Sequence, residues 1–343
     1  YGPALIDRAL LDALCRALDV SFYRAVQENL VGAAPFEGLD LPAFFSGLEP
    51  AKSIAARHTV GLVDPITTLD VKERVNDGLP ETLEEVVARY GQRYFKLKVA
   101  GDARADLERL AAIAAVLDRI PGPYHASLDG NEQYEDMAGV TELWRRMKGD
   151  SRLARLVGSI LFIEQPVKRS HAFERRVDGI EKPVIIDESD DSLDAFPRAR
   201  ALGYKGVSSK TCKGLYKSLV NRARCARWND EAGAAVFFMS GEDLTIQPGL
   251  ALQQDLALVS LLGITHVERN GHHYVNGMAE LPQGEQEAFL AAHPDLYERS
   301  HGAVRVRIRD GMLAIGSLDC QGYASRAMPE WASMRRTQWA SVS

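Results

Sequence analysis

Several short runs in this chain place an ionisable side chain directly after a stretch of apolar residues. Acidic residues follow three such stretches, at Asp129, Glu164 and Asp187, each about one strand–helix unit from the next. Three carboxylates repel one another strongly as free anions, and a hard divalent cation removes that penalty. A site built from oxygen ligands, without His or Cys, favours Mg²⁺, with Mn²⁺ as the alternative, over Zn²⁺. Any one of these acids could instead be a helix N-cap, but three in this order predict a metal site.

Lysines accompany the acids in the same kind of position. Lys96 and Lys98 are two residues apart, so both point to one face of their predicted strand. If that face lies inside the protein, burying the lysine charges costs free energy unless they are paired or functional. Lys210 comes four strands later, across a closed barrel. Lysines on two sides of a bound substrate carbon can remove or return a proton on either face of that carbon. If the carbon lies next to a carboxylate, removal of its proton gives a dianionic enediolate, which a metal ion and a cationic lysine beside it stabilise.

The elements that must position these side chains alternate along most of the chain. Helix-like stretches separate short β-rich runs, and the predicted strands are 58–63, 94–99, 124–129, 160–164, 184–187, 206–209, 235–239 and 264–268. Eight strands, most of them followed by a helix, predict an α/β fold with a closed parallel (β/α)8 TIM-like barrel. An open doubly wound sheet is the rival, but no Gly-rich first turn supports it.

The segments on either side of the barrel differ from it. We expect residues 1–56 to form the helical part of a partial α+β capping domain, 57–280 the catalytic barrel, and 281–343 a segment that returns to the cap. Two short strands, 303–309 and 312–315, are predicted to be joined at Asp310–Gly311 and to pair outside the barrel. The start at Tyr1 leaves open whether further cap residues precede it.

Composition narrows the classes of function. The chain has 343 residues, 46% of them hydrophobic and 26% charged, which is typical of globular proteins. A formal net charge of −6 and the lack of a Lys/Arg-dense run argue against a nucleic-acid partner. No apolar run has the length of a membrane span. The four cysteines are far apart in the sequence and read as reduced thiols of a cytoplasmic protein.

The motifs together resemble a known family. Over roughly residues 3–280 the chain resembles the enolase superfamily, in its mandelate racemase/muconate lactonizing enzyme branch and closest to the muconate-lactonizing-enzyme-like subgroup. The matching motifs, in order, are Lys96-Leu97-Lys98, Asp129-Gly130-Asn131, Glu164-Gln165-Pro166, Asp187-Glu188-Ser189 and Lys210. Each motif is weak alone, but five in register are specific.

The resemblance implies roles for the chemical groups. Asp129, Glu164 and Asp187 would be the metal ligands, and Lys98 and Lys210 the acid/base pair on opposite faces of the substrate. Such enzymes act on small-molecule carboxylates and are usually symmetric homo-oligomers.

Four further residues take supporting roles by the same resemblance. Lys96 would neutralise the substrate carboxylate, Asn131 and Glu188 would support the metal ligands, and Glu268 would lie at the barrel mouth near the substrate. The chain also departs from relatives of this kind. It lacks the Asp-x-Asp pattern of dipeptide epimerases after the eighth strand, and it lacks the His–Asp dyad of mandelate racemase-like members.

The leading reaction is racemisation or epimerisation, because the two lysines flank both faces of the substrate carbon. Cycloisomerisation, or β-elimination of water from a hydroxy acid, uses the same parts. A catalytically silent metal-binding barrel and a Schiff-base aldolase using Lys210 are the remaining alternatives.

Other polar residues near the predicted strand ends have plainer interpretations. Glu242 and Asp243 are interpreted as loop acids, with a substrate contact as the alternative. Lys213 is interpreted as a surface charge. His272 and His273 are interpreted as a loop anchor, with a substrate role as the alternative.

Overall fold

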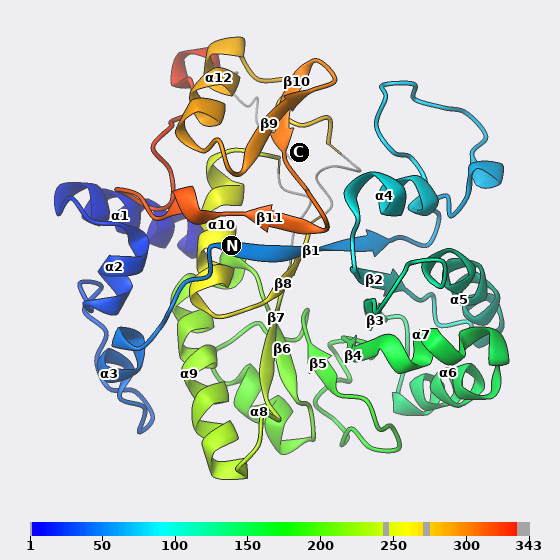
Figure 1. Cartoon of the computed structure of the whole chain (residues 1–343). Helices are drawn as coiled ribbons and strands as arrows, with labels where there is room; N and C mark the ends of the chain where they lie inside the picture. Colours follow the sequence, from blue (N-terminus) through cyan, green and yellow to red (C-terminus); the bar gives the residue numbers. More distant parts are fainter. Residues whose placement is uncertain (1, 243–246, 270–274, 335–343) are drawn as a thin grey trace, which may run out of the picture.

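Eight parallel strands of the chain close into a barrel (Figure 1). The computed structural model describes residues 2–242, 247–269 and 275–334. The barrel strands are β1 (Ser53–Val60), β2 (Tyr94–Lys98), β3 (His125–Asp129), β4 (Ile160–Glu164), β5 (Val184–Ile186), β6 (Gly206–Ser209), β7 (Phe238–Gly241) and β8 (His266–Glu268).

Closure of the barrel is shown by the two partners of β1. The strand pairs in parallel with β2 on one side, where Arg57 lies opposite Tyr94, and with β8 on the other, where Arg57 lies opposite Glu268. The predicted (β/α)8 barrel is therefore confirmed, and the open sheet is excluded. Because all eight strands run the same way, their carboxyl ends meet at one mouth.

Helices connect the strands and cover the outside of the barrel. They are α4 (Leu83–Tyr90), α5 (Ala103–Leu117), α6 (Met137–Gly149), α7 (Ala154–Ser159), α8 (Ala195–Ala201), α9 (Leu215–Ala232) and α10 (Leu250–Leu261). Local chemistry sets their ends. In α4, Thr82 accepts a hydrogen bond from the backbone N–H of Glu85 and the Glu85 side chain accepts one from that of Thr82, while Gly91 ends the helix at φ 65°.

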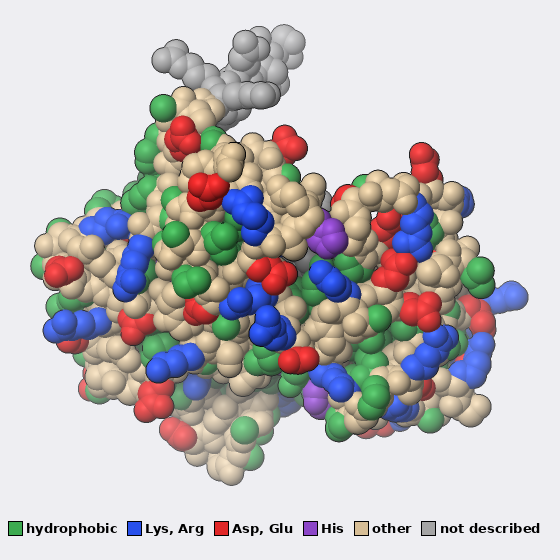
Figure 2. Space-filling view, turned by 45° about the horizontal axis from the view of Figure 1, so that its top comes forward, with side chains coloured by type: hydrophobic (Ala, Val, Ile, Leu, Met, Phe, Trp, Pro, Cys, Tyr) green, Lys and Arg blue, Asp and Glu red, His purple; other side chains and the backbone are tan. Residues whose placement is uncertain are grey.

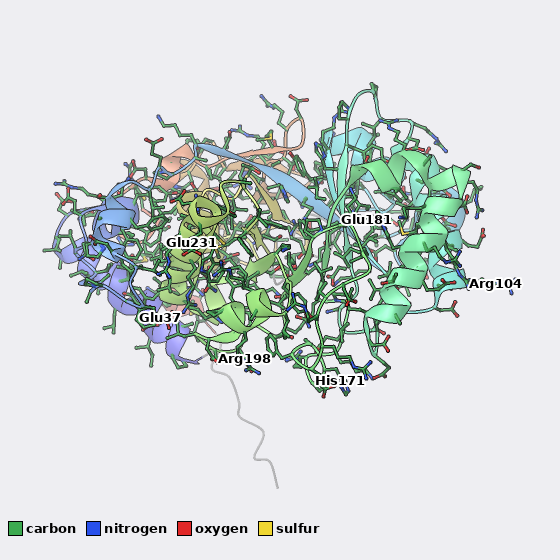
Figure 3. The ribbon with its side chains drawn as sticks, turned by 90° about the horizontal axis from the view of Figure 1, so that it is seen from below. Glu37, Arg104, His171, Glu181, Arg198 and Glu231 are labelled. Carbon is green, nitrogen blue, oxygen red and sulfur yellow. The ribbon has the colours of Figure 1, made fainter. Side chains whose placement is uncertain are left out.

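The N-terminal helices form a separate layer on one side of the barrel. Helices α1 (Gly2–Ala17), α2 (Phe22–Gln27) and α3 (Leu41–Ser46) pack against α9 and α10. Figure 3 shows them on the side marked by Glu37, opposite α5 and α6 on the side marked by Arg104. One hydrophobic core is shared by these helices, the adjoining half of the barrel and the C-terminal segment.

The C-terminal segment has one feature that the sequence did not predict. After α12 (Gln283–Ala292), β9 (Tyr297–Ser300) and β10 (Ala303–Val306) form an antiparallel pair, but β11 (Met312–Ala314) joins the barrel sheet antiparallel to β1 (Figure 1). The expectation that both C-terminal strands pair outside the barrel is therefore wrong for β11. The turn between them is as predicted, with Asp310 at φ 51° and Gly311 at φ 74°. A side chain at Gly311 would lie 2.9 Å from the Gly91 carbonyl, so only glycine fits there.

The surface mixes charges of both signs. On the face drawn in Figure 2, acidic and basic side chains are interspersed over most of the molecule. Among the described residues, no helix combines the length and the apolar character that crossing a bilayer requires. The four cysteines, all of them described, are unpaired thiols.

A buried histidine ties α12 to the C-terminal segment and makes the fold acid-sensitive. The His293 ring lies 3.0 Å from the Ser317 hydroxyl through Nδ1, and its Nε2 accepts a hydrogen bond of 3.3 Å from the backbone N–H of Arg326. A proton on Nε2 would face that N–H, and burial lowers the pKa of His293 to about 4.

We predict that stability falls as the pH drops from about 6.5 towards 4, because the unfolded chain, with an ordinary histidine pKa, binds the proton more readily than the folded one. The loss at pH 5 relative to pH 7.5 is about 2 kcal/mol from this group. Urea unfolding of His293→Gln should show a weaker pH dependence over this range. The exposed His171→Gln is the control, and an unchanged slope in His293→Gln would contradict the assignment.

Candidate metal and acid/base site

The barrel mouth holds a buried ammonium group among four carboxylates. Lys96 points inward from β2, and its Nζ lies 2.9 Å from Asp129, 3.0 Å from Glu164 and 3.2 Å from Glu268, and also contacts Glu242. All five side chains are buried. Burial by itself would lower the pKa of Lys96, but the attraction of the carboxylates outweighs it and raises that pKa well above its usual value. Lys96 therefore stays charged.

Three of these carboxylates converge closely. Asp129 at the end of β3, Glu164 at the end of β4 and Glu242 directly after β7 each offer an oxygen, and the three oxygens lie within 4.8 Å of one another. Burial raises the pKa of Glu164 well above its usual value, and the negative charge of Glu242 adds to the effect. Oxygen Oε2 of Glu164 is buried and accepts no hydrogen bond, although Lys96 is near. This donor set, all oxygen and too crowded for free anions, fits a hard divalent cation.

Asp187, the third acid of the predicted ligand set, lies just outside that group. Its Oδ2 is 2.7 Å from Nζ of Lys210, and its Oδ1 is 2.6 Å from Nζ of Lys213. Lys213 also donates to the carbonyls of Asp187 and Ser208, at 2.7 and 3.0 Å. Lys213 was expected to be a surface charge, and that interpretation is wrong, because the lysine ties the ends of β5 and β6 together.

The two predicted acid/base lysines lie on opposite walls of the mouth. Lys98 ends β2, is partly exposed and pairs with Asp129. Lys210 follows β6, four strands further round the ring, and bridges Asp187 and Glu242, each at 2.7 Å. Burial would lower the pKa of Lys210, but Glu242 and Asp187 together raise it far above its usual value. A ligand in the mouth between these residues has a lysine side chain on each side.

Asn131 and Glu188 form a polar contact at the rim. The Asn131 side-chain amide donates to Glu188, and its backbone N–H donates to Oδ1 of Asp129 at 2.9 Å. Burial, and secondarily the charge of Asp187, raises the pKa of Glu188 to about 7. The contact therefore joins the loops that follow β3 and β5.

Strained backbone and a buried amide set the loop positions. Gln165 sits at φ 30°, and its Oε1 accepts the backbone N–H groups of Asp187 and Ser189, at 2.8 and 3.1 Å. At Gly130 a β-carbon would lie 2.4 Å from the Cα of Pro166, so only glycine allows the β3 and β4 loops to approach. These two residues fix the loops that follow Asp129, Glu164 and Ile186.

The charges at the mouth do not balance among the described residues. Four lysine ammonium groups face six carboxylates, which leaves two negative charges in excess; the residues are Lys96, Lys98, Lys210, Lys213, Asp129, Glu164, Asp187, Glu188, Glu242 and Glu268. Two of the carboxyl groups, Glu164 and Glu188, have raised pKa values. One divalent cation would supply the missing charge without protonation.

Reasoning from the sequence missed Glu242 as part of the site. It was interpreted as a loop acid, but it is buried against Lys96 and Lys210. The signal was its position directly after a strand, like Asp129 and Glu164. Glu268 does lie in the mouth, where it accepts a hydrogen bond from Thr59 at 2.5 Å. Asp243, His272 and His273 lie outside the described residues.

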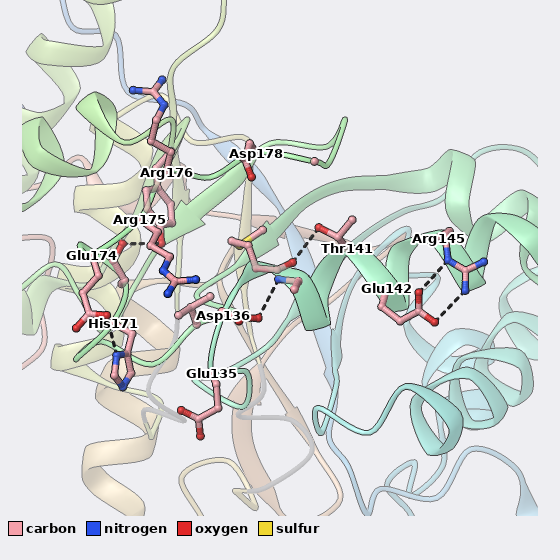
Figure 4. Close-up of a pocket in the computed structure, with 16 residues that line it drawn as sticks. Glu135, Asp136, Thr141, Glu142, Arg145, His171, Glu174, Arg175, Arg176 and Asp178 are labelled. Carbon is pink, nitrogen blue, oxygen red and sulfur yellow. Dashed lines mark hydrogen bonds and ion pairs between the residues drawn. The ribbon is translucent and has the colours of Figure 1, made fainter.

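A large open pocket lies elsewhere and does not contain the site. It has a volume of about 840 Å³ and lies between α6 and the loop after β4, where Glu142, Arg145, His171 and Arg175 line it (Figure 4). None of the predicted site residues lines it. The candidate site therefore rests on the convergence of charges at the mouth.

Several solved structures are similar in fold to this chain. The dipeptide epimerase from Methylococcus capsulatus, complexed with Mg and the dipeptide L-Arg-D-Lys, is 18% identical over 90% of this chain and 71% of its own, with a TM-score of 0.53. A mandelate racemase/muconate lactonizing family protein from Azoarcus sp. EbN1 is 19% identical over 95% and 71%, with a TM-score of 0.56. The 3,6-anhydro-D-galactonate cycloisomerase from Zobellia galactanivorans is 16% identical over 92% and 72%, with a TM-score of 0.54.

The chain shares the fold of mandelate racemase/muconate lactonizing proteins. At these identities the likeness concerns the fold alone. No protein-family model matches the chain, and no curated protein matches it in sequence.

We predict that Lys96→Met destabilises the metal-free protein by about 3 kcal/mol or more, because it leaves four buried carboxylates without their shared cation. Urea unfolding measures the effect, and added Mg²⁺ should restore part of the loss. Lys98→Met is the matched control: the side chain is partly exposed and has one carboxylate partner, so the loss should be about 1 kcal/mol. Equal stability of Lys96→Met and the unsubstituted protein would show that Lys96 does not balance this cluster.

Proposed function

We propose that the chain is an isomerase or lyase of the enolase superfamily that removes the α-proton of a small carboxylate substrate through an enediolate, with Mg²⁺ as cofactor and Mn²⁺ as a substitute. Racemisation or epimerisation is the proposed reaction. The observation that carries this proposal is the placement of Lys98 and Lys210 on opposite walls of a mouth whose floor is a buried carboxylate cluster. The Mg in the dipeptide epimerase structure supports the choice of metal.

The chemistry follows from the charge that the reaction creates. Removing a proton beside a carboxylate adds a second negative charge to the substrate. A bound divalent cation would stabilise the charge on the substrate oxygens. Asp129 and Glu164, with Asp187 as the third acid of the motif, would hold it. Lys96, already among the carboxylates, supplies a fixed positive charge at the same place.

The two lysines would divide the proton transfers. Lys210 remains an ammonium group because Glu242 and Asp187 hold it in that form, so it can deliver a proton to one face of the planar intermediate. Lys98, which is partly exposed and has Asp129 and Asn131 as contacts, lies on the other side, where its neutral amine would accept the α-proton. Delivery on the face opposite to removal inverts the carbon, which is racemisation or epimerisation. Loss of a neighbouring hydroxyl as water would make the enzyme a dehydratase instead, and formation or cleavage of a ring bond at the β-carbon would make it a cycloisomerase.

Exchange of the α-proton with solvent tests this function. The protein is incubated in D₂O with Mg²⁺ and a panel of hydroxy acids, sugar acids, N-acyl amino acids and dipeptides, and NMR detects deuterium at the α-carbon. Deuterium in both stereoisomers identifies racemisation or epimerisation, and loss of water identifies elimination. EDTA should stop the exchange. If no acid in the panel exchanges its α-proton, the enzymatic proposal fails and a silent barrel is left.

Replacing one lysine separates catalysis from binding. We predict that Lys98→Ala lowers the exchange rate about 10²- to 10⁴-fold, because this is what a positioned acid/base group typically contributes to the rate. Metal binding, followed by calorimetry, should change by less than about tenfold, because Lys98 is not an oxygen donor. The exposed Lys148→Ala is the control and should exchange like the unsubstituted protein. Equal exchange in Lys98→Ala would remove this lysine from the mechanism.

A further inference from the structure

The side chain of Glu242 lies between two lysines that reach the mouth from different strands. Its Oε1 contacts Nζ of Lys96, which comes from β2, and its Oε2 lies 2.7 Å from Nζ of Lys210, which follows β6. Glu242 is 3% exposed, so both contacts are shielded from water, where an ion pair is stronger than at the surface. One carboxylate therefore links the lysine that would neutralise the substrate carboxylate to the lysine that would deliver the proton.

The backbone that carries this carboxylate is fixed by its neighbours. The backbone N–H of Glu242 donates to the Ser209 carbonyl at 3.1 Å, and the carbonyl of the preceding Gly241 accepts a hydrogen bond of 2.8 Å from Arg57. At Gly241 a β-carbon would lie 3.1 Å from the side chain of Val259, so the end of β7 packs closely against α10. The Glu242 side chain thus starts from a defined position.

The backbone of Lys210 is held by contacts that do not involve Glu242. The next residue, Thr211, donates its backbone N–H to Oδ1 of Asp255 on α10 at 3.0 Å. The lysine side chain is a flexible four-carbon stem, so the partners of its ammonium group decide where Nζ lies. Among the described residues its ion-pair partners are Asp187 and Glu242. Since Asp187 belongs to the proposed metal ligands, Glu242 is the partner of Lys210 outside that set.

Lys98, on the opposite wall, has different partners. Its Nζ lies 2.5 Å from Asp129 and 3.4 Å from the side-chain oxygen of Asn131. Within the part of the chain that the structure describes, no ion pair or hydrogen bond joins Lys98 to Glu242. A change at Glu242 should therefore act on one of the two acid/base lysines.

We propose that Glu242 is a positioning residue that holds the Lys210 ammonium group against one face of the substrate, so that inversion depends on it while proton removal by Lys98 does not. The inference rests on the proposed function, because it concerns the same acid/base pair. In the delivery step an N–H bond of Lys210 breaks, and the electron pair of the enediolate forms the new bond between that proton and the α-carbon. Lys210 is left as a neutral amine that solvent reprotonates, and Lys98 loses the proton it has taken to solvent.

The ratio of inversion to exchange in D₂O tests this step separately from the overall rate. The substrate is the acid of the panel that the unsubstituted protein exchanges with Mg²⁺, supplied as the single stereoisomer whose α-proton Lys98 removes. Lys210→Ala identifies that stereoisomer, because it should still be deuterated by this variant but not inverted. Deuterium in the recovered starting stereoisomer reports removal and return by Lys98, and deuterium in the inverted one reports delivery by Lys210.

Glu242→Gln should lower the ratio of inversion to exchange about tenfold or more, because a small misplacement of a reacting group costs a large factor in rate. Glu268→Gln is the matched comparison: it also removes a carboxylate from Lys96, but its ion pair is with Lys96 and not with Lys210, so both rates should change together and the ratio should stay. An unchanged ratio in Glu242→Gln would overturn the inference and leave the proposed function standing. Absence of exchange in the unsubstituted protein would remove both.

Binding of Mg²⁺ gives a readout that needs no turnover. By calorimetry, Glu242→Gln should lose less than about 100-fold in affinity, the upper end of what a group that only supports a metal ligand contributes. A larger loss would show that Glu242 acts through the metal, which would refute a role in positioning Lys210. Circular dichroism establishes that each variant is folded. If Glu242→Gln does not fold, Glu242→Asp, which keeps the charge but is shorter by one methylene group, is judged by the same ratio and the same two outcomes.

Discussion

The arrangement of the mouth depends on one interaction, the burial of the Lys96 ammonium group among four carboxylates. Each of these groups would be costly to bury alone, since a charge without a partner loses its hydration and gains nothing in return. Together the carboxylates keep the lysine charged, as the raised pKa of Lys96 shows. Because the carboxylates come from β3, β4, β7 and β8, one side chain on β2 cross-links distant parts of the ring.

The barrel makes that interaction possible by bringing strand ends together that are far apart in the sequence. Lys96 and Glu268 are 172 residues apart along the chain but 3.2 Å apart in the mouth. The loops complete the arrangement through residues that are not ionisable. Gly130 allows β3 and β4 to approach, and the Gln165 amide holds the start of the loop that carries Asp187. Their contribution is geometric, and substitution there would change how the charges are placed.

Much of this organisation could be read from the sequence, and the reasons differ by element. Strand periodicity and the spacing of helices predicted the closed barrel, because those signals are local. The positions of Lys96, Asp129 and Glu164 follow from the same local rule, since side chains at the ends of parallel strands converge. The pairing of β11 with β1 could not be read locally, because it joins Ala314 to Ser53 across almost the whole chain. Glu242 and Lys213 were misjudged for a related reason: their environment depends on strands that are not their sequence neighbours.

The charge balance also couples substrate binding to the cation. Lys96 can neutralise a substrate carboxylate only if some of its present partners are engaged elsewhere, because four carboxylates already surround it. A cation held by Asp129 and Glu164 would engage two of them and remove the excess of two negative charges at the same time. Without it, an incoming carboxylate would meet a net negative mouth and an ammonium group that is fully occupied. The buried lysine that holds these carboxylates together is therefore the group that would make carboxylate binding depend on metal.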